Sequence, residues 1–274
     1  MLAGKTFLIT GIADRHSLAM YAAQLIQEHG GTVVCTGLGI TPFHQNLSER
    51  ATAFLEQTYA DFEYSVRQTL GEEVITAKLD VTLPASVHAF FDRMQSENIT
   101  FDGLLHAIAM DKTIREKRVK PLLEVSLEEF CQTMDVSAFS LITLINAMQQ
   151  RSLLCAGASI CSLSYIAAEK VTFHPYRNIS IAKAALERIT VELADELGRQ
   201  HDIRVNCIRF SPYMGSKAGN ATLNEDDLNT AHRLSPLGNA LPEDLAYEVL
   251  HLFRPGSRIT GEIRHVDGGY HIMG

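Results

Sequence analysis

The chain has 274 residues, of which 46% are hydrophobic and 20% are charged, and its formal net charge is −8. This composition suffices for a full hydrophobic core and argues against disorder. The negative balance argues against broad binding to nucleic acid or to an anionic membrane. No apolar run reaches the roughly 18 residues that span a bilayer, and the chain enters a strand pattern at once instead of a signal peptide.

Cysteine usage points to a reducing compartment. The cysteines are scattered and form no Cys-x-x-Cys pair, so we expect reduced thiols rather than disulfides or metal ligands. They are Cys35, Cys131, Cys155, Cys161 and Cys207. We therefore expect a cytoplasmic protein without a metal site.

Short apolar runs rich in β-branched residues alternate with helical patterns along the whole chain. Runs this apolar are typical of strands covered on both faces of a parallel sheet. The expected strands are residues 5–10, 31–36, 73–79, 101–109, 158–164, 203–210 and 261–267. Repeated β-α-β units predict an α/β fold, a single doubly wound Rossmann-type domain over residues 1–274 with a seven-stranded parallel sheet flanked by helices.

Three helical patterns stand out between the strands. Residues 17–31 end in two glycines, and residues 126–150 begin with Ser126 and Glu129 at capping-box spacing. Residues 178–200 have apolar positions at intervals of three and four. The stretch 37–72 is long for one connection and is expected to contain a further helix.

The turn after the first expected strand reads TGIADRHSLA at residues 10–19. It lacks G-x-G-x-x-G, but strand, Gly11 and helix start occur in the order of a dinucleotide site, where free N–H groups face a pyrophosphate. Ser17 is expected to cap the helix or to bind a phosphate, and Ala19 allows the helix to approach the sheet. An ordinary turn with a serine cap explains the same residues.

The ends of the next two strands bear on the second half of such a cofactor. Residues 33–39 contain no acid for a ribose hydroxyl and no arginine or lysine for a 2′-phosphate, which favours NADH over NADPH. Asp80, after the third strand, is a candidate to accept a hydrogen bond from an adenine amino group. A solvated helix-capping aspartate is the alternative.

Tyr176 and Lys183 are seven positions apart, which is nearly two helical turns, so both side chains can share one face. A tyrosine that protonates a carbonyl usually lies four positions before its lysine, and here that position is Ile179. A buried lysine beside a phenol would orient a cofactor and make the phenol a better donor to a developing oxyanion. A loop tyrosine and a solvated lysine explain the same pattern.

Together these motifs resemble the enoyl-acyl-carrier-protein reductases of the short-chain dehydrogenase/reductase superfamily, from residues 4–19 to residues 261–270. The family's G-x5-S-x-A turn is matched, its H-S-I-G strand end reads HAIA, and its closing segment reads HVDGG. Its Tyr, Tyr, Lys segment is present with about one extra residue between the tyrosines. The matching positions are Gly11, Ser17, Ala19, 106–109, Tyr165, Tyr176, Lys183 and 265–269.

The resemblance implies reduction of a trans-2-enoyl thioester by hydride transfer from NADH, in fatty-acid or related acyl biosynthesis. Tyr176 would bind the thioester carbonyl and stabilise the enolate, and Lys183 would hold the nicotinamide ribose. Tyr165 would line the acyl pocket, with its part in protonation left open. The implied cofactor contacts are Gly11, Ser17, Leu18, Leu38, Asp80, Val81, Ile108, Lys183 and Tyr213.

The resemblance also implies a substrate-binding segment near 211–235, a thioester of acyl carrier protein or coenzyme A, and a homotetramer. The helices at 126–150 and 179–199 would form the interfaces between its subunits. A carbonyl reductase of the same superfamily and a catalytically inactive nucleotide-binding homologue are the alternatives.

Two segments depart from the family pattern. Where the family reads G-P-I-x-T, residues 211–215 read SPYMG, with Tyr213 in the isoleucine place and Gly215 in place of a threonine that touches cofactor phosphates. Ser216 is a candidate substitute for that threonine. Ala109 stands where glycine is usual, which implies reduced sensitivity to the aromatic inhibitors of this family and allows an inhibitor-tolerant or secondary-pathway variant.

Acyl carrier proteins are acidic, so a surface that binds them should be basic. Residues 216–230 contain one lysine and three acids, whereas the stretch 111–120 gathers most of the local positive charge. Its basic residues are Lys112, Arg115, Lys117, Arg118 and Lys120. We expect the carrier to bind at this loop, and a solvated charged loop is the alternative.

Overall fold

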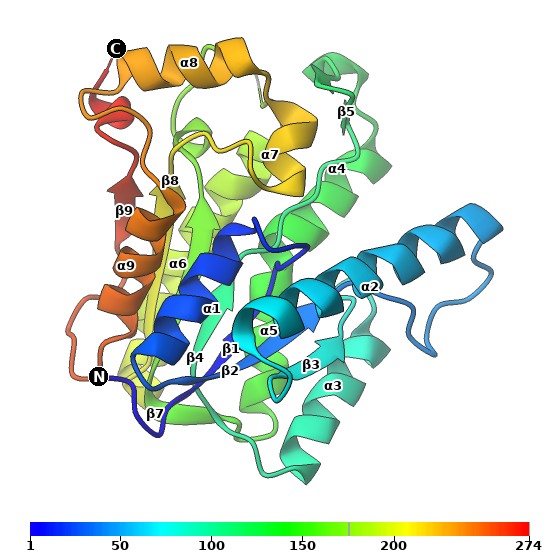
Figure 1. Ribbon diagram of the computed structural model, residues 1–274, viewed down its shortest axis with the longest axis vertical. Coiled ribbons are helices and arrows are strands. Elements are labelled where there is room, and N and C mark those ends of the chain that lie inside the picture. Colours follow the sequence, from blue (N-terminus) through cyan, green and yellow to red (C-terminus); the bar gives the residue numbers. More distant parts are fainter. Residues whose placement is uncertain (175, 274) are drawn as a thin grey trace.

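Seven strands form one sheet in which all neighbouring strands are parallel, in the order β3-β2-β1-β4-β7-β8-β9 (Figure 1). The computed structural model describes residues 1–174 and 176–273. The strands are β1 (Thr6–Ile9), β2 (Thr32–Gly37), β3 (Ile75–Lys78), β4 (Phe101–His106), β7 (Leu154–Ser164), β8 (Arg204–Phe210) and β9 (Ile263–Val266). The predicted α/β fold with a doubly wound sheet is confirmed. Its strand order reverses between β1 and β4, and ligands bind outside the carboxyl ends at such a point.

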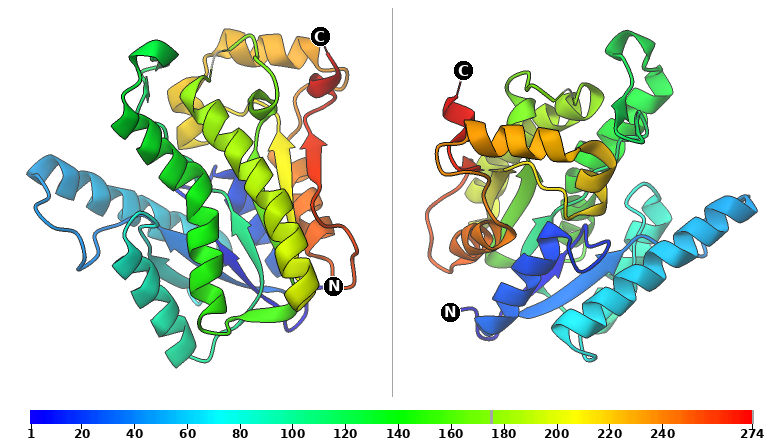
Figure 2. Two further views of the ribbon diagram at one scale, coloured as in Figure 1. Left: turned by 180° about the vertical axis from the view of Figure 1, so that it is seen from behind. Right: turned by 45° about the horizontal axis from the view of Figure 1, so that its top comes forward.

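Helices cover both faces of the sheet (Figure 2). One face carries α1 (Leu18–Glu28), α2 (Glu49–Leu70) and α9 (Pro242–Phe253). The other carries α3 (Pro84–Ser96), α4 (Leu127–Met134), α5 (Ser140–Gln149) and α6 (Asn178–His201). Each face has its own buried apolar cluster, and successive strand residues alternate between the two, as Leu8 and Ile9 do. α2 is the further helix expected within 37–72. No helix of the described part of the chain is long and apolar enough to cross a membrane.

The strand bounds differ from the sequence prediction at β4 and β7. β7 begins four residues earlier than expected, because Leu154 pairs with Phe101 across a register shift. β4 ends at His106, after which the chain leaves the sheet. The backbone of Met110 exchanges hydrogen bonds of 2.9 and 3.0 Å with the hydroxyl of Ser137. The helical layer therefore holds this segment at Met110, whereas the N–H group of Ala107 still donates to the hydroxyl of Thr10 after β1 at 3.4 Å.

The helix expected over 126–150 is interrupted. Ser126 and Glu129 form the predicted capping box at the start of α4, but Asp135–Phe139 form a π-helical turn (η2) before α5 begins. Such turns occur frequently at functional sites. Here the turn carries Ser137, which contacts Met110 after β4, and leads into Ser140, which contacts His106 at the end of β4.

Further short elements stand over the end of the sheet toward which β8 and β9 point (Figure 1). They are α7 (Lys217–Thr222), α8 (Glu225–Leu234) and a hairpin of β5 (Ile114–Arg115) and β6 (Arg118–Val119). The 3-10 turns η1 (Leu122–Glu124), η3 (Ile166–Ala168) and η4 (Tyr270–Ile272) complete the chain. The hairpin contains most of the basic cluster expected as a loop, and the N–H group of Lys117 donates to the carbonyl of Ala221 in α7 at 3.0 Å.

α2 packs closely on the sheet at Gly37 of β2, where a substitution can test the contact. A Cβ atom at this position would lie 2.4 Å from Cδ1 of Phe62, which is fully buried. We expect Gly37→Ala to lower the free energy of unfolding by about 1–3 kcal/mol, because the ring has no space into which to move.

Gly198→Ala is the matched control, because its added carbon meets nothing closer than 3.7 Å and the residue lies within α6. Helix propensity predicts that this variant is stabilised by about 1 kcal/mol. Urea denaturation measures the free energy of unfolding of both variants. Equal values would contradict the close packing of Phe62 against Gly37.

Candidate active site

The three residues predicted to be catalytic lie together at the carboxyl ends of β4 and β7. Tyr165 directly follows β7, and the centre of its ring is 5.0 Å from that of Tyr176, with the planes inclined by 57°. Lys183 lies in the second turn of α6, and its Nζ donates to the carbonyls of Leu163 at 2.8 Å and of Ile108 at 3.4 Å. Two phenols and one ammonium group thus lie at one edge of the sheet. The predicted shared helix face was wrong, because α6 begins at Asn178 and Tyr176 lies in the loop before it.

The charge states suit stabilisation of a developing negative charge. Burial raises the pKa of both Tyr165 and Tyr176 well above the usual range, so both phenols keep the proton that a donor needs. Burial lowers the pKa of Lys183 to about 8. An ammonium group has three donors, and two acceptors are recorded for Lys183 within the described residues, which leaves one donor for a ligand.

His106 is a buried neighbour of Lys183 that the sequence did not single out for a role. Its Nε2 donates to the hydroxyl of Ser140 at 2.8 Å, since that hydroxyl donates in turn to the carbonyl of Val136. Burial, followed by the charge of Lys183, lowers the pKa of His106 to about 3. The imidazole is therefore neutral, and Lys183 carries the positive charge at this end of β4.

The glycine turn has the form expected of a dinucleotide site. Gly11 has φ of +82°, and a Cβ atom there would lie 2.2 Å from the carbonyl oxygen of Ala107. Only glycine allows β1 and the segment after β4 to come this close. α1 begins at Leu18 and has no acidic residue in its first turn, and the carboxylate of Asp14 before it accepts from the N–H group of His16 at 2.9 Å.

Of the two roles expected for Ser17, capping of α1 was wrong, and binding of a phosphate stays a prediction. Its hydroxyl forms no capping bond, and it accepts hydrogen bonds from the N–H groups of Ala13 and Asp14 at 2.9 and 3.1 Å. Ser17 therefore closes the turn that precedes the helix. Which N–H group a serine at this position serves depends on the path of that turn, and the local sequence does not specify it.

The other residues expected to contact the cofactor also follow strand ends. Leu38 follows β2 and is 37% exposed, whereas Val81 is buried. Asp80 accepts from the N–H group of Thr82 at 2.9 Å and from Nε2 of His44 at 3.2 Å, so it braces two loops beside the crevice. His44 is a neighbour of the site that the strand pattern does not indicate, because it lies in the long connection before α2.

Tyr213 and Gly215, the two departures in the segment after β8, depend on each other. The hydroxyl of Tyr213 is hydrogen-bonded to Tyr21 of α1, and burial raises its pKa. A Cβ atom at Gly215 would lie 2.1 Å from that hydroxyl, so a side chain at 215 is excluded while Tyr213 adopts this position. Ser216 accepts from the N–H group of Gly219 at 3.1 Å and thereby caps α7.

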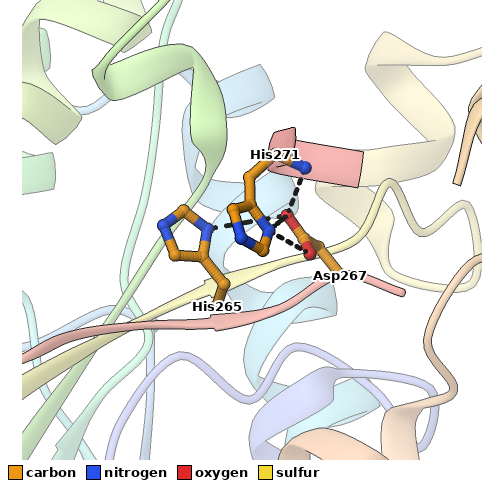
Figure 3. Close-up of side chains that lie close together, drawn as sticks. All are labelled: His265, Asp267 and His271. Atoms are coloured by element: carbon orange, nitrogen blue, oxygen red, sulfur yellow. Dashed lines mark hydrogen bonds and ion pairs between the residues drawn. The ribbon is translucent and has the colours of Figure 1, made fainter. Parts of the chain in front are cut away.

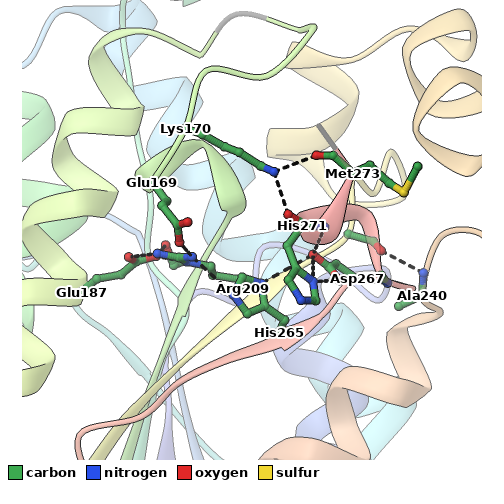
Figure 4. A network of polar contacts seen from close by, with 12 residues as sticks. Glu169, Lys170, Glu187, Arg209, Ala240, His265, Asp267, His271 and Met273 are labelled. Carbon is green, nitrogen blue, oxygen red and sulfur yellow. Dashed lines mark hydrogen bonds and ion pairs between the residues drawn. The ribbon is translucent and has the colours of Figure 1, made fainter. Parts of the chain in front are cut away.

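A buried ion pair fixes α6 to the sheet, and sequence analysis missed it (Figure 4). Glu187 accepts from Nε and Nη2 of Arg209 at 2.8 and 2.6 Å, and from the hydroxyl of Ser164 at 2.6 Å. Arg209 also contacts the exposed Glu169 and, at 3.4 Å, Nε2 of His265. The available signal was an acidic residue four positions after Lys183, on the helix face that carries the lysine.

Three potential metal-ligating side chains lie at the end of β9, namely His265, Asp267 and His271 (Figure 3). Their ligand atoms lie within 4.8 Å of one another. However, Nδ1 of His271 donates to Asp267 at 2.9 Å, and this carboxylate also accepts the N–H groups of Gly269 and His271. The rings of His265 and His271 stack 3.8 Å apart and 21° from parallel, so their nitrogen lone pairs do not converge. This geometry favours a hydrogen-bonded clamp on the C-terminal segment over a metal centre.

The parallel sheet, the glycine turn at its switch point and the Tyr–Tyr–Lys group are those of the short-chain dehydrogenase/reductase class. Residues 11–271 match the family model described as Enoyl-(Acyl carrier protein) reductase. The chain belongs to this family.

Curated relatives and solved structures agree over the full length. The enoyl-(acyl-carrier-protein) reductase (NADH) of Rickettsia bellii is 33% identical over 100% of this chain and 96% of its own, and that of Bacillus cereus is 30% identical over 100% and 99%. The crystal structure of the Aquifex aeolicus enzyme has a TM-score of 0.84 at 29% identity and covers 100% of this chain and 98% of that chain. The structure described as the FabI–NADH complex of Alistipes finegoldii has a TM-score of 0.84 at 28% identity, over 100% and 90%.

Removing one partner of the buried ion pair should destabilise the fold strongly. Glu187→Ala leaves Arg209 buried without its main partner, and we expect a loss of about 3–5 kcal/mol in the free energy of unfolding. Glu169→Ala removes the other carboxylate of the same arginine, but its side chain is 59% exposed, so the expected loss is at most about 1 kcal/mol. Urea denaturation of both variants measures the difference, and similar losses would show that the buried pair does not anchor α6.

Proposed function

We propose that this protein reduces the trans-2 double bond of an enoyl thioester by hydride transfer from NADH, in fatty-acid or related acyl biosynthesis. The observation that carries the proposal is the placement of Tyr165, Tyr176 and Lys183 at the switch-point crevice, in a chain of the enoyl-(acyl-carrier-protein) reductase family. NADH, when bound, supplies the hydride. The N–H groups at the start of α1 and the spare donor of Lys183 fit its pyrophosphate and ribose.

The roles of the side chains follow from their charge states. Tyr176, held neutral by burial, donates a hydrogen bond to the thioester carbonyl and stabilises the enolate that forms when the β-carbon accepts hydride. Lys183 holds the nicotinamide ribose and adds positive charge beside the phenols. Tyr165 packs against Tyr176 and lines the acyl pocket.

NADH is favoured over NADPH by the end of β2. The residues after this strand include no arginine or lysine that could pair with a 2′-phosphate, and Leu38 is the exposed side chain there. The position four residues before Lys183 holds Ile179, where a reductase whose tyrosine protonates a carbonyl usually has that tyrosine. Both phenols and the lysine are present and correctly charged, which argues against an inactive homologue.

Tyr176→Phe tests the role of the phenol. Removing one oxyanion donor is expected to lower kcat by about 10² to 10³, while the affinity for NADH stays close to that of the wild type. NADH oxidation at 340 nm with a trans-2-enoyl thioester measures the rate. Because the chain has no tryptophan, the change in the fluorescence of NADH itself measures cofactor binding.

Tyr247→Phe is the matched control, because Tyr247 is 61% exposed on α9 and should tolerate the same loss of a hydroxyl. Absence of turnover by the wild type, with either nicotinamide cofactor and on both carrier and coenzyme A thioesters, would refute the proposed reaction. Full activity of Tyr176→Phe would refute only the assigned role.

The carrier of the thioester is proposed to bind at the β5–β6 hairpin. Arg115, Lys117 and Arg118 are exposed there, and the hairpin contacts α7 of the substrate segment through the backbone of Lys117. The adjacent helix α8 begins with acidic residues and would repel an acidic carrier protein. A basic surface beside the substrate segment complements such a carrier.

The hairpin proposal predicts a KM effect that depends on the carrier. Arg115→Gln with Arg118→Gln should raise KM for an enoyl-acyl-carrier-protein several-fold, with little change in kcat, and the effect should shrink as salt is added. Arg258→Gln is the control, because Arg258 is exposed and pairs with Asp202 at the opposite end of α6. An unchanged KM would leave the hairpin as a solvated charged loop.

We further propose that residues 1–274 act as one catalytic domain with its substrate-binding segment near 211–235, and that copies of the chain form a homotetramer in the cytoplasm. Large apolar side chains are exposed on the helices expected to form the interfaces. They are Leu127 of α4, Phe139 of the π turn and Ile181 of α6, at 77%, 54% and 38% exposure. Contact between copies would remove these side chains from water.

A further inference from the structure

His174 is a buried histidine beside the catalytic tyrosine for which the proposed reaction has no role. It lies in the loop before α6, and its exposed fraction is 7%. Its ring meets that of Tyr176 edge to face, with centres 4.9 Å apart and planes inclined by 75°. The hydroxyl of Thr172 donates to the His174 carbonyl at 2.6 Å, which holds this loop in place.

One ring nitrogen of His174 is anchored to α8. Nδ1 lies 3.3 Å from Oδ2 of Asp227, and this carboxylate is itself fixed by the capping box with Asn224 at the start of the helix. Because a carboxylate accepts, Nδ1 carries the hydrogen. Burial lowers the pKa of His174 although the charge of Asp227 opposes the shift, so the ring is neutral at pH 7 and Nε2 holds a lone pair.

The other ring nitrogen lacks a partner. Nε2 is buried, and the described residues offer it no hydrogen bond. A buried acceptor without a donor is costly, whereas a carboxylate that fixes the tautomer leaves Nε2 prepared to accept. Nε2 is thus an acceptor left for a donor from outside the described residues.

We propose that His174, oriented by Asp227, accepts a hydrogen bond from an amide N–H group of the bound reactants, and that this group is the first amide of the thioester arm. This inference rests on the proposed function. In acyl carrier protein and in coenzyme A alike, an amide nitrogen is two carbons from the thioester sulfur. If Tyr176 holds the thioester carbonyl, that amide lies only a few bonds away, and His174 is the neighbouring ring. The carboxamide of nicotinamide offers the same donor chemistry.

The arrangement links substrate binding to catalysis. Tyr176 would fix the carbonyl and His174 the arm beyond the sulfur, so two hydrogen bonds would orient the double bond toward the cofactor. Because Asp227 belongs to α8, the helix of the substrate segment would be tied to the catalytic loop through the same histidine.

The test compares two thioesters and three proteins. The first thioester is a trans-2-enoyl N-acetylcysteamine thioester, which contains the amide, and the second is the S-pentyl thioester, which replaces the amide by methylene groups. His174→Phe keeps a ring against Tyr176 but removes the acceptor, and His174→Gln places an amide oxygen near the position of Nε2. His201→Gln is the control, because His201 is exposed at the far end of α6.

We expect wild type and His201→Gln to have a KM about three- to tenfold lower for the amide-containing thioester than for the S-pentyl analogue, the effect of one hydrogen bond. In His174→Phe this preference should disappear, and in His174→Gln part of it should return. The affinity for NADH, measured by fluorescence, should stay within twofold in all of them.

Other outcomes identify what is wrong. A weaker NADH affinity in His174→Phe, with the preference between thioesters retained, would make the carboxamide the donor and overturn the assignment to the arm. Unchanged preference and unchanged NADH affinity would overturn the site altogether. If the wild type shows no turnover, the proposed reaction fails separately, and calorimetric affinities for the two saturated thioesters measure the same preference without catalysis.

Discussion

The active site depends on the position of α6 relative to the sheet, and the carboxylate of Glu187 sets that position. It accepts two hydrogen bonds from Arg209 of β8 and one from Ser164 of β7, all between 2.6 and 2.8 Å. Lys183 lies one helical turn earlier on the same face, and Tyr165 directly follows Ser164. The ion pair therefore fixes the ammonium group and the first phenol in one frame. Because a buried pair contributes little net stability but is costly to break, its main consequence is positional.

The C-terminal segment extends this frame around the site. Lys170, five residues after Tyr165, donates to the carbonyls of His271 and Met273 at 2.6 and 2.8 Å. Tyr270 is hydrogen-bonded to Tyr165, and Asp267 ties the turn that carries it. A segment remote in sequence from the catalytic residues thus determines where the Tyr165 ring lies. The stacked histidines of Figure 3 belong to this support.

Regular patterns in the sequence were sufficient to predict the fold. β-branched apolar runs gave the strands and their parallel arrangement, and the capping box at 126–129 gave the start of α4. The β5–β6 hairpin was not predictable, because strands of two residues have no period to detect. The π turn at 135–139 was hidden as well, since its residues continue the apolar spacing of the helices on both sides.

Predicting the site had a different limit. Tyr176 and Lys183 are only seven positions apart, so the sequence could indicate them as a pair, but it could not indicate that Tyr176 lies in the loop before α6. The contact between His174 and Asp227 joins residues 53 positions apart, and nothing in either neighbourhood indicates the other.

The change at 211–215 could be seen in the sequence, but its consequence could not. In the sequence, Gly215 indicates the loss of the threonine hydroxyl that the family has at this position. In the structure, however, the hydroxyl of Tyr213 lies 2.1 Å from where a Cβ atom of residue 215 would be. The segment therefore still presents a hydroxyl at this place, from a ring that also bonds α1 across the crevice. Two substitutions that each look disruptive are, in three dimensions, one coherent repacking, which fits an active reductase better than a degenerate one.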